Sequence, residues 1–305
     1  MKQNQKPFLK WVGGKTQILD RLLPHFPKEI WNYHEPFVGG GSVLLAVLSL
    51  QKKNETTIHN KIYAYDLNER LIRLYIDMQQ NVEELFEGLD CVVQEYSCLQ
   101  GSVINRKPKT MEDAITSKES YFYWVRDCFN QSDVQSIESS VLFLFLNKTC
   151  FRGMYREGPN GFNVPFGHYK CAPTFLKDEF LKISDLIKDV EFIHCDFASS
   201  LAHAKTGDFV YLDPPYAPEK DKSFVGYTQD GFSLNTHLKL FKEVEKLNEK
   251  HISFSMSNAK VELVMQNCKQ FMCEDVIARR AINSKKPGST TTEVIICNTQ
   301  PPYHL

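Results

Sequence analysis

The sequence predicts an α/β fold with an open sheet, interrupted by a mainly helical insertion. Short apolar runs that suit buried strands are followed by glycine-rich loops or carboxylates and then by helical patterns, first over 31–75 and again from 191 onward. Between them, helical periodicity dominates residues 78–189. Because that interval is too long for a crossover connection, it indicates an inserted subdomain. We therefore expect residues 1–77 and 190–305 to form one domain and 78–189 to form the insertion.

The composition is that of an ordinary globular chain and excludes several other classes. The 305 residues are 42% hydrophobic, and the net charge of −1 means that a nucleic-acid partner would need a local basic patch. No run of 18 apolar residues and no apolar signal region occurs, so we expect neither membrane insertion nor secretion, and a cytoplasmic location or, for a viral protein, one inside the host cell. The nine scattered cysteines form no CxxC pair, which indicates reduced thiols without a zinc site.

Two glycine clusters precede predicted helices. In the first, Gly13 and Gly14 are followed by Lys15 and a helical pattern at about 16–23. Free backbone amides beside a lysine suit a carboxylate or a phosphate, although a surface lysine after a plain turn is the simpler alternative.

The second cluster, EPFVGGGS at 35–42, lies between a candidate strand at 31–34 and a buried helix at 43–50. Strand, glycine loop and helix in this order bring the backbone close to a cofactor. The cluster does not match GxGxxG and no Walker lysine follows, so a nucleotide phosphate is not the favoured ligand.

Carboxylates end two further strands. Asp66 follows the strand 62–65, about 25 residues beyond the glycine loop, where it is placed to bind ribose hydroxyls. The alternative is an Asx turn or a cap, and Asn68 is the better candidate for capping the next helix. Asp196 closes the strand 191–195, where it could lie near the adenine amine of a cofactor.

The tetrapeptide Asp213-Pro214-Pro215-Tyr216 follows the short buried strand 209–212. Two prolines end the ladder, so a carboxylate and an aromatic ring are held on a stiff turn at the carboxyl end of a strand, where open α/β sheets bind ligands. An acceptor beside a flat ring suits a planar substrate with an amino group. On four residues alone, a capped strand-ending turn explains the pattern equally well.

Inside the insertion, residues 147–170 combine basic and aromatic side chains on a loop rich in glycine and proline. Such a loop suits phosphate contacts, guanine recognition and wedging between bases. We expect Phe162 and Phe166 to anchor the loop to its own core, and Arg156 with either Phe151 or Met154 to contact DNA. A second basic stretch at 278–290 is either another contact surface or merely solvated.

Taken together, FLKWVGGK, EPFVGGGS, YAYDLN, LNKTCFRGMYR with GFNVPFGHY, and VYLDPPYAP resemble the Dam-type, or DpnM-like, DNA adenine-N6 methyltransferases of the α class. The resemblance spans about residues 7–298. DPPY alone leaves other amino-methyltransferases open, whereas the FNVPFG block narrows the resemblance to this family. It implies a Rossmann-like S-adenosylmethionine-dependent methyltransferase fold with a mainly helical inserted target-recognition subdomain.

The resemblance also implies a set of site residues. Those at the S-adenosyl-L-methionine site are Trp11, Lys15 (near the methionine carboxylate), Phe37, Gly39, Gly40, Gly41, Asp66 (ribose), Asp196 and Phe197 (adenine), and Asp213. The catalytic motif is Asp213, Pro214, Pro215 and Tyr216. The residues placed at DNA are Lys10, Phe151, Arg152, Met154, Arg156 (guanine) and Pro165, with Arg152 standing where some relatives have an uncharged residue.

The resemblance implies that the partner is double-stranded DNA carrying GATC, and a cognate restriction endonuclease is a further candidate. It implies no membrane partner and no metal, and we expect a monomer in solution. The chemistry fits, because the Asp213 carboxylate and the Pro214 carbonyl can accept both hydrogens of an adenine amine, and Tyr216 can stack on a flipped base. No Pro-Cys dipeptide of the kind used by cytosine-C5 enzymes occurs. The alternatives are an N4-cytosine or RNA-adenine methyltransferase, and an inactive DNA-binding protein.

Overall fold

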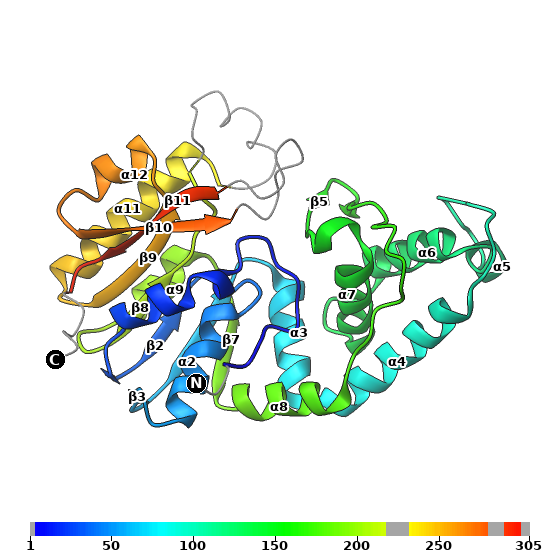
Figure 1. The fold of residues 1–305 in the computed structure, drawn as a ribbon, viewed down its shortest axis with the longest axis horizontal. Coiled ribbons are helices and arrows are strands. Elements are labelled where there is room, and N and C mark those ends of the chain that lie inside the picture. The colour runs from blue at the N-terminus through cyan, green and yellow to red at the C-terminus, as the bar shows by residue number, and fades with distance from the viewer. Residues whose placement is uncertain (1–3, 218–231, 280–289, 300–305) are drawn as a thin grey trace. The chain divides into compact units, whose positions relative to one another are not determined.

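The computed structural model (Figure 1) describes residues 4–217, 232–279 and 290–299. It divides into two compact units, the first built from residues up to 6, 13–67 and 189 onward, the second from 7–12 and 68–188. The sequence-based boundaries differ from this division in two places. Residues 7–12, called the strip 7–12 below, belong to the second unit. The helix α3 (Glu69–Gln80) also belongs to it, because α3 packs on the helices α4 (Val82–Cys98), α7 (Ile137–Thr149) and α8 (Lys177–Ile187).

The first unit contains a seven-stranded sheet in the order β10-β11-β9-β8-β2-β4-β7. Its strands are β2 (Tyr33–Glu35), β4 (Ile62–Asp66), β7 (Val190–His194), β8 (Phe209–Leu212), β9 (Ser253–Ala259), β10 (Met272–Arg279) and β11 (Thr290–Cys297). The five strands from β7 to β9 run parallel, and β11 and β10 extend the sheet in antiparallel pairing. A separate parallel pair joins β1 (Glu29–Ile30) to β3 (Thr57–Ile58).

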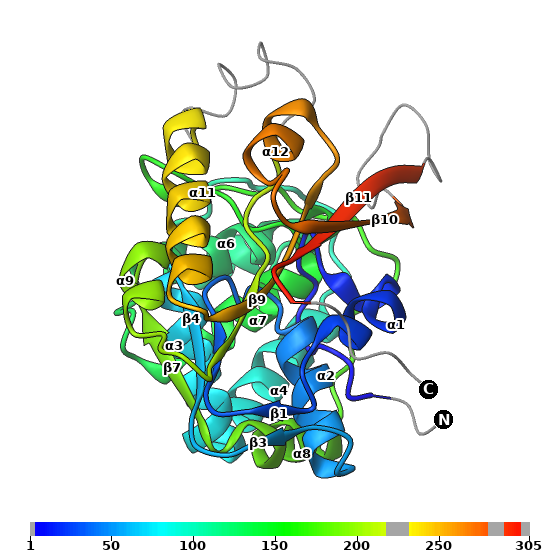
Figure 2. The same cartoon turned by 90° about the vertical axis from the view of Figure 1, so that its left-hand side faces the viewer.

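Helices cover both faces of this sheet (Figure 2). On one face, α9 (Phe197–Ala202), α11 (Leu234–Glu249) and α12 (Glu262–Asn267) bury an apolar cluster that includes Val210, Phe254 and Ile296. The helices α2 (Ser42–Lys52) and α1 (Leu19–Leu22) lie on the other face. The sequence predicted one continuous helix at 16–23, but the structure has the short α1 between two 3-10 turns at 15–17 and 23–25. The Phe26 ring packs on this face, 4.6 Å from that of Phe209.

The strand order reverses between β2 and β8. From β2 the chain moves outward through β4 to β7 and then returns to β8, on the other side of β2. At such a reversal, the loops that follow the two neighbouring strands diverge and leave a crevice for ligands. These loops are the glycine cluster after β2 and residues 213–217 after β8, so the predicted Rossmann-like α/β fold is confirmed.

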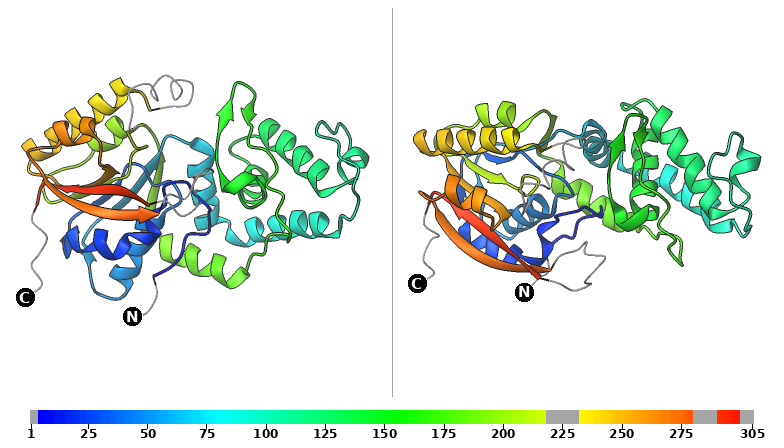
Figure 3. Two further views of the ribbon diagram at one scale, coloured as in Figure 1. Left: turned by 45° about the horizontal axis from the view of Figure 1, so that its top comes forward. Right: turned by 90° about the horizontal axis from the view of Figure 1, so that it is seen from above.

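The second unit is mainly helical. Besides α3, α4, α7 and α8 it contains α5 (Met111–Ala114), α6 (Lys118–Gln131), the turn η3 (Phe151–Gly153) and the hairpin β5 (Glu157–Gly158) with β6 (Gly161–Phe162). Helix α7 is buried on nearly all sides because α3, α4 and α6 all pack on it, which explains its mostly apolar sequence. The hairpin lies against α6, and η3 lies against α7 (Figure 3). Within the described residues, no helix has both the length and the apolar character needed to cross a bilayer.

A buried carboxylate joins two helices of the second unit. Asp77 of α3 is fully buried and accepts hydrogen bonds from the Arg73 guanidinium (2.6 and 3.0 Å) and from the Ser140 hydroxyl of α7 (2.6 Å). The Asn81 amide adds a further bond of 3.0 Å. Every oxygen of this carboxylate is therefore paired inside the core.

Replacing Asp77 with alanine should destabilise the protein by about 3–5 kcal/mol, because Arg73 loses its buried partner and Ser140 its acceptor. Urea unfolding followed by circular dichroism measures this free energy. The matched control is Asp90→Ala on the exposed side of α4, which should change it by no more than about 0.5 kcal/mol. Equal effects of the two substitutions would contradict the structural role of Asp77.

Candidate active site and DNA-contact loop

The glycine cluster after β2 forms a tight turn into α2. Gly39 and Gly41 have φ angles of 47° and 70°, which favour glycine, and the Gly41 amide donates to the Val38 carbonyl at 2.8 Å. Gly41 is also the N-cap of α2. The Gly39 amide donates to the Asp66 carboxylate at 3.0 Å, so the ends of β2 and β4 are joined at this edge of the sheet.

The other predicted cofactor carboxylate caps a helix. Asp196 is exposed, and its side chain accepts from the Ser199 amide at the start of α9 (2.8 Å). This backbone hydrogen bond holds the pKa of Asp196 below its usual value. Next to it, the Phe197 ring stacks on that of Phe37 at 5.7 Å. The structure thus places Phe37 and Phe197 together and gives Asp196 a capping bond that the sequence did not indicate.

The turn after β8 contacts the lysine of the first glycine cluster. Lys15 is only 3% exposed, and its ammonium lies 2.8 Å from the Asp213 carboxylate and 4.8 Å from the centre of the Tyr216 ring. The Lys15 amide donates to the Ser42 hydroxyl at the start of α2 (2.9 Å). A plain surface lysine is therefore excluded. Of the two prolines, the first, Pro214, is buried and the second is exposed.

Burial sets the protonation of two carboxyl groups near this lysine. It raises the pKa of Asp213 to about 6, against the opposing effect of the Lys15 ammonium. Burial raises the pKa of Glu35 further, to about 8, although the Tyr33 hydroxyl donates to this carboxyl at 2.7 Å. At neutral pH the site therefore combines a protonated Glu35 with an ionised Asp213, which can accept hydrogen bonds from an amine.

Three side chains at this site were not singled out in the sequence. Glu35 was seen only as part of the glycine motif, and nothing local marks it as a protonated acid. The Tyr216 hydroxyl donates to Glu293 at 2.7 Å, and the Ala217 amide donates to Asn258 at 3.3 Å. For Glu293 a signal did exist, since it is an acid at the start of the apolar run EVIIC.

Within the described ranges, no group of three or more His, Cys, Asp or Glu could hold a metal ion.

In the second unit, the strip 7–12 packs beside α7. Trp11 stacks on Tyr155 at 5.9 Å and on Phe143 at 6.4 Å. The Lys10 amide and carbonyl bond to the Asn147 side chain (2.9 and 2.7 Å). The Lys10 ammonium lies 4.3 Å from the centre of the Tyr169 ring. Both Trp11 and Lys10 are therefore parts of the unit that carries the basic loop.

A basic cleft of about 340 Å³ adjoins Lys10. Its lining includes Lys148, Tyr169 and Lys170. Burial, together with the nearby Lys10 charge, lowers the pKa of Lys148 to about 8. An anion in the cleft would stabilise the charged form of Lys148 and raise its pKa again, so the cleft suits a phosphate group.

The basic loop is anchored by buried aromatic rings and exposes others. Phe162 packs against Phe129 and Phe166 against Phe122, which confirms the predicted anchors. The Phe151 amide donates to the carbonyl of the exposed Pro165 at 2.8 Å, so the two sides of the loop are held together. Phe151 itself is 43% exposed.

The arginines of this loop lie at its surface. Arg156 is exposed, and its Nε donates to Asn163 across the hairpin at 2.6 Å, which uses one of its five N–H groups. Arg152 has a φ angle of 57°, and its guanidinium lies 5.2 Å from the Phe151 ring. Met154 is half-buried. The other basic stretch, 278–290, lies mostly outside the described residues.

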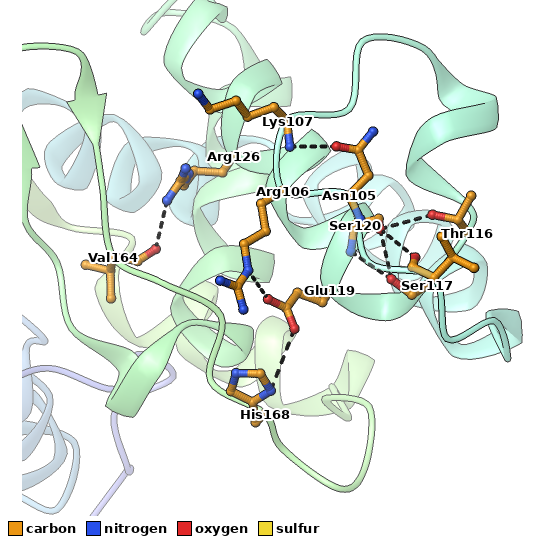
Figure 4. Close-up of polar contacts among 11 residues, drawn as sticks. Asn105, Arg106, Lys107, Thr116, Ser117, Glu119, Ser120, Arg126, Val164 and His168 are labelled. Carbon is orange, nitrogen blue, oxygen red and sulfur yellow. Dashed lines mark hydrogen bonds and ion pairs between the residues drawn. The ribbon is translucent and has the colours of Figure 1, made fainter.

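The end of the loop is tied to α6 by polar contacts (Figure 4). Glu119 is nearly buried, with Arg106 Nε at 2.7 Å on one side and His168 Nδ1 at 4.0 Å on the other. Arg126 of the same helix donates to the Val164 carbonyl at 3.5 Å. Arg126 and Glu119 of α6 thereby hold both Val164 and His168 of the loop.

The fold is of the α/β class that binds ligands at a strand reversal, with an acidic and aromatic turn at that point and a loop of basic and aromatic side chains in the second unit. Comparison with known proteins gives the family. Residues 11–282 match the model of the D12 class N6 adenine-specific DNA methyltransferases. The chain belongs to this family and is an adenine-specific DNA methyltransferase, so the resemblance seen in its motifs is confirmed.

Individual relatives match over nearly the whole chain. The type II methyltransferase M.MjaIII of Methanocaldococcus jannaschii is 35% identical over 305 residues, covering 96% of this chain and 99% of the relative. The DNA adenine methylase of Escherichia coli K12 is 32% identical, covering 96% and 94%. That of Haemophilus influenzae is 34% identical, covering 84% and 80%.

The raised pKa of Glu35 predicts a specific dependence of stability on pH. The folded state keeps a proton that the unfolded chain releases near pH 4.5, so this group lowers the stability as the pH rises from about 4.5 to about 8. Glu35→Gln should remove that loss. Its free energy of unfolding, relative to the unmodified protein, should therefore rise between pH 5 and pH 8, by up to about 1.4 kcal/mol per pH unit. A difference that stays constant with pH would show that Glu35 is ionised in the folded protein.

Proposed function

We propose that this protein transfers a methyl group from S-adenosyl-L-methionine to the exocyclic amine of a flipped adenine in duplex DNA, within the sequence GATC. The observation that carries the proposal is that Asp213 and Tyr216, on one turn at the strand reversal between β2 and β8, both contact the buried Lys15 ammonium. This arrangement offers an acceptor and a stacking face to one planar amine.

The residues around the glycine turn fit the cofactor. Lys15 supplies a buried cation for its carboxylate, Asp66 supplies acceptors for its ribose, and the stacked Phe37 and Phe197 supply an apolar surface for its adenine. Gly39 to Gly41 bring backbone close to it, and Asp196 lies next to Phe197. When bound, the cofactor supplies an electrophilic methyl group on its sulfonium.

The residues of the turn orient the target amine. Asp213 and the Pro214 carbonyl accept its two hydrogens, which favours a tetrahedral nitrogen with its lone pair free to attack. Pro215 stiffens the turn, and Tyr216 stacks on the extruded base. Asp213 is paired with the Lys15 ammonium in the structure. Because a carboxylate has several acceptor positions and an ammonium several donors, Asp213 can accept from the amine while the pair persists.

The second unit carries target recognition. Arg156 is held by Asn163 with further N–H groups for the two acceptors of a guanine edge, and Lys10 reaches a second guanine. The exposed Phe151, with Met154 and Pro165, contacts the bases next to the extruded adenine, and Arg152 contacts the flanking backbone. The cleft that Lys10 shares with Lys148 and Lys170 receives a phosphate.

The names of relatives suggest the setting. Those of Methanocaldococcus jannaschii and Lactococcus lactis are type II methyltransferases, so a restriction endonuclease that cuts the same site is the partner class we propose. The enzyme would work as a monomer inside the cell that holds its DNA.

One assay tests the activity and the site together. The protein is incubated with methyl-labelled cofactor and with duplexes that contain GATC, GTAC or a scrambled site, and the labelled base is identified after hydrolysis. We expect N6-methyladenine in the GATC duplex alone. Equal labelling of all three would refute the GATC assignment. Labelled cytosine would favour an N4-cytosine enzyme, and bound but unlabelled DNA an inactive binding module.

Asp213→Ala should abolish methyl transfer and leave DNA binding within about threefold, because the DNA-contact residues lie in the second unit. Label transfer and a gel-shift titration measure the two effects. Equal loss of both would mean that Asp213 is needed for folding instead of transfer.

Arg156→Ala should weaken discrimination at one guanine of the target by about 1–3 kcal/mol. The ratio of kcat/KM between GATC and single-base variants measures this. Lys170→Ala is the matched control, since loss of a phosphate contact should lower binding on every sequence alike. A uniform decrease for Arg156→Ala would make it a phosphate contact too.

A further inference from the structure

One acidic residue of β11 stands immediately before the buried apolar part of that strand, beside the candidate active site. Residues 294–297 of β11 are buried and apolar, and Glu293 precedes them. This strand lies inside the sheet between β9 and β10, and Glu293 is opposite Ala259 in β9. Glu293 itself is half-buried, and its carboxylate has a partner in the site.

The partner of Glu293 is the hydroxyl of Tyr216, which donates to its Oε2 at 2.7 Å. A hydrogen bond to a carboxylate is stronger and more directional than one between neutral groups. Burial raises the pKa of Tyr216, and the charges of Asp213 and Glu293 raise it further, so the hydroxyl stays a donor.

The same region of the sheet holds the backbone of the turn. The Ala217 amide donates to Asn258 Oδ1 (3.3 Å), which also accepts from the Ala259 amide (2.8 Å). With the Lys15 ammonium over the Tyr216 ring, the ring is fixed at its hydroxyl, at its face and at the chain that follows it.

The charge of Glu293 also reaches Asp213. It raises the pKa of that carboxyl, but less than burial does and against the opposing effect of Lys15. The contribution of Glu293 that the geometry supports is therefore the hydrogen bond that restrains Tyr216.

We propose that Glu293 is a positioning residue, which acts through the Tyr216 hydroxyl to fix the ring plane on which the target base stacks. The inference rests on the proposed adenine transfer. Because reaction rates depend steeply on the placement of the attacking atom, a ring free to tilt lowers turnover without weakening duplex binding.

The test compares Glu293→Ala, Glu293→Gln, Tyr216→Phe and the double variant Tyr216→Phe with Glu293→Ala, after thermal melting has shown that each is folded. Glu293→Ala should lower kcat about tenfold with KM for DNA nearly unchanged. Glutamine still offers an oxygen to the hydroxyl, so Glu293→Gln should stay within about threefold of the unmodified protein. In the Tyr216→Phe background, Glu293→Ala should add less than about twofold, because the bond is already lost.

A duplex with 2-aminopurine at the target adenine reports on stacking. Its fluorescence rises when the base leaves the duplex and falls when it stacks on Tyr216, so Glu293→Ala should give a brighter complex than the unmodified protein. The matched control is Glu274→Ala on the neighbouring strand β10, whose carboxylate bonds to Arg21 and His25 and should affect neither kcat nor fluorescence.

Two results would overturn the inference. One is a kcat for Glu293→Ala equal to that of Glu274→Ala, and the other is an equal loss in the alanine and glutamine variants, which would assign the effect to charge alone. Failure of the proposed function is distinct, because the unmodified protein would then transfer no label to adenine.

Discussion

The ion pair between Lys15 and Asp213 is the interaction on which the site depends. A buried ammonium is tolerated only with a partner, and this pair joins the first glycine cluster to the turn after β8. Through the Lys15 amide, the same residue is bonded to the start of α2. The glycine loops and the turn after β8 are therefore joined by one buried cation.

The first unit collects several carboxyl groups near the turn after β8. Glu35 and Asp213 both have raised pKa values because they are buried, and Glu293 adds to the effect on Asp213. Such conflicts with the rules for stable cores are expected where a site must act on a ligand. The protonated state of Glu35 removes one charge and leaves Asp213 as the acceptor.

In the second unit, buried phenylalanine rings hold the basic loop 147–170 in place at the surface. Phe162 and Phe166 attach the loop to α6, so that Phe151 and Arg156 are presented on a rigid base instead of a mobile one. The Gly153 turn has no room for a side chain, since a Cβ there would lie 2.5 Å from that of Lys10. The strip 7–12 is thereby held beside the loop.

The sequence alone determined the elements whose signals are local. Apolar runs ended by glycines, by Asp66 or by two prolines marked the central strands, and Asn68 was correctly expected to cap α3, where it accepts from the Leu71 amide. Helical periodicity over 78–189 likewise indicated that the second unit is mainly helical. It gave no sign of the β5–β6 hairpin, because two-residue strands carry too little pattern.

Tertiary structure decided what depends on distant residues. The long segment of the second unit begins at Asn68 and not at 78, because α3 packs on the other helices of that unit. Tyr216 and Glu293 are 77 residues apart and meet only because β8, β9 and β11 are neighbours in the sheet. The protonation of Glu35 likewise follows from burial, which no run of neighbouring letters encodes.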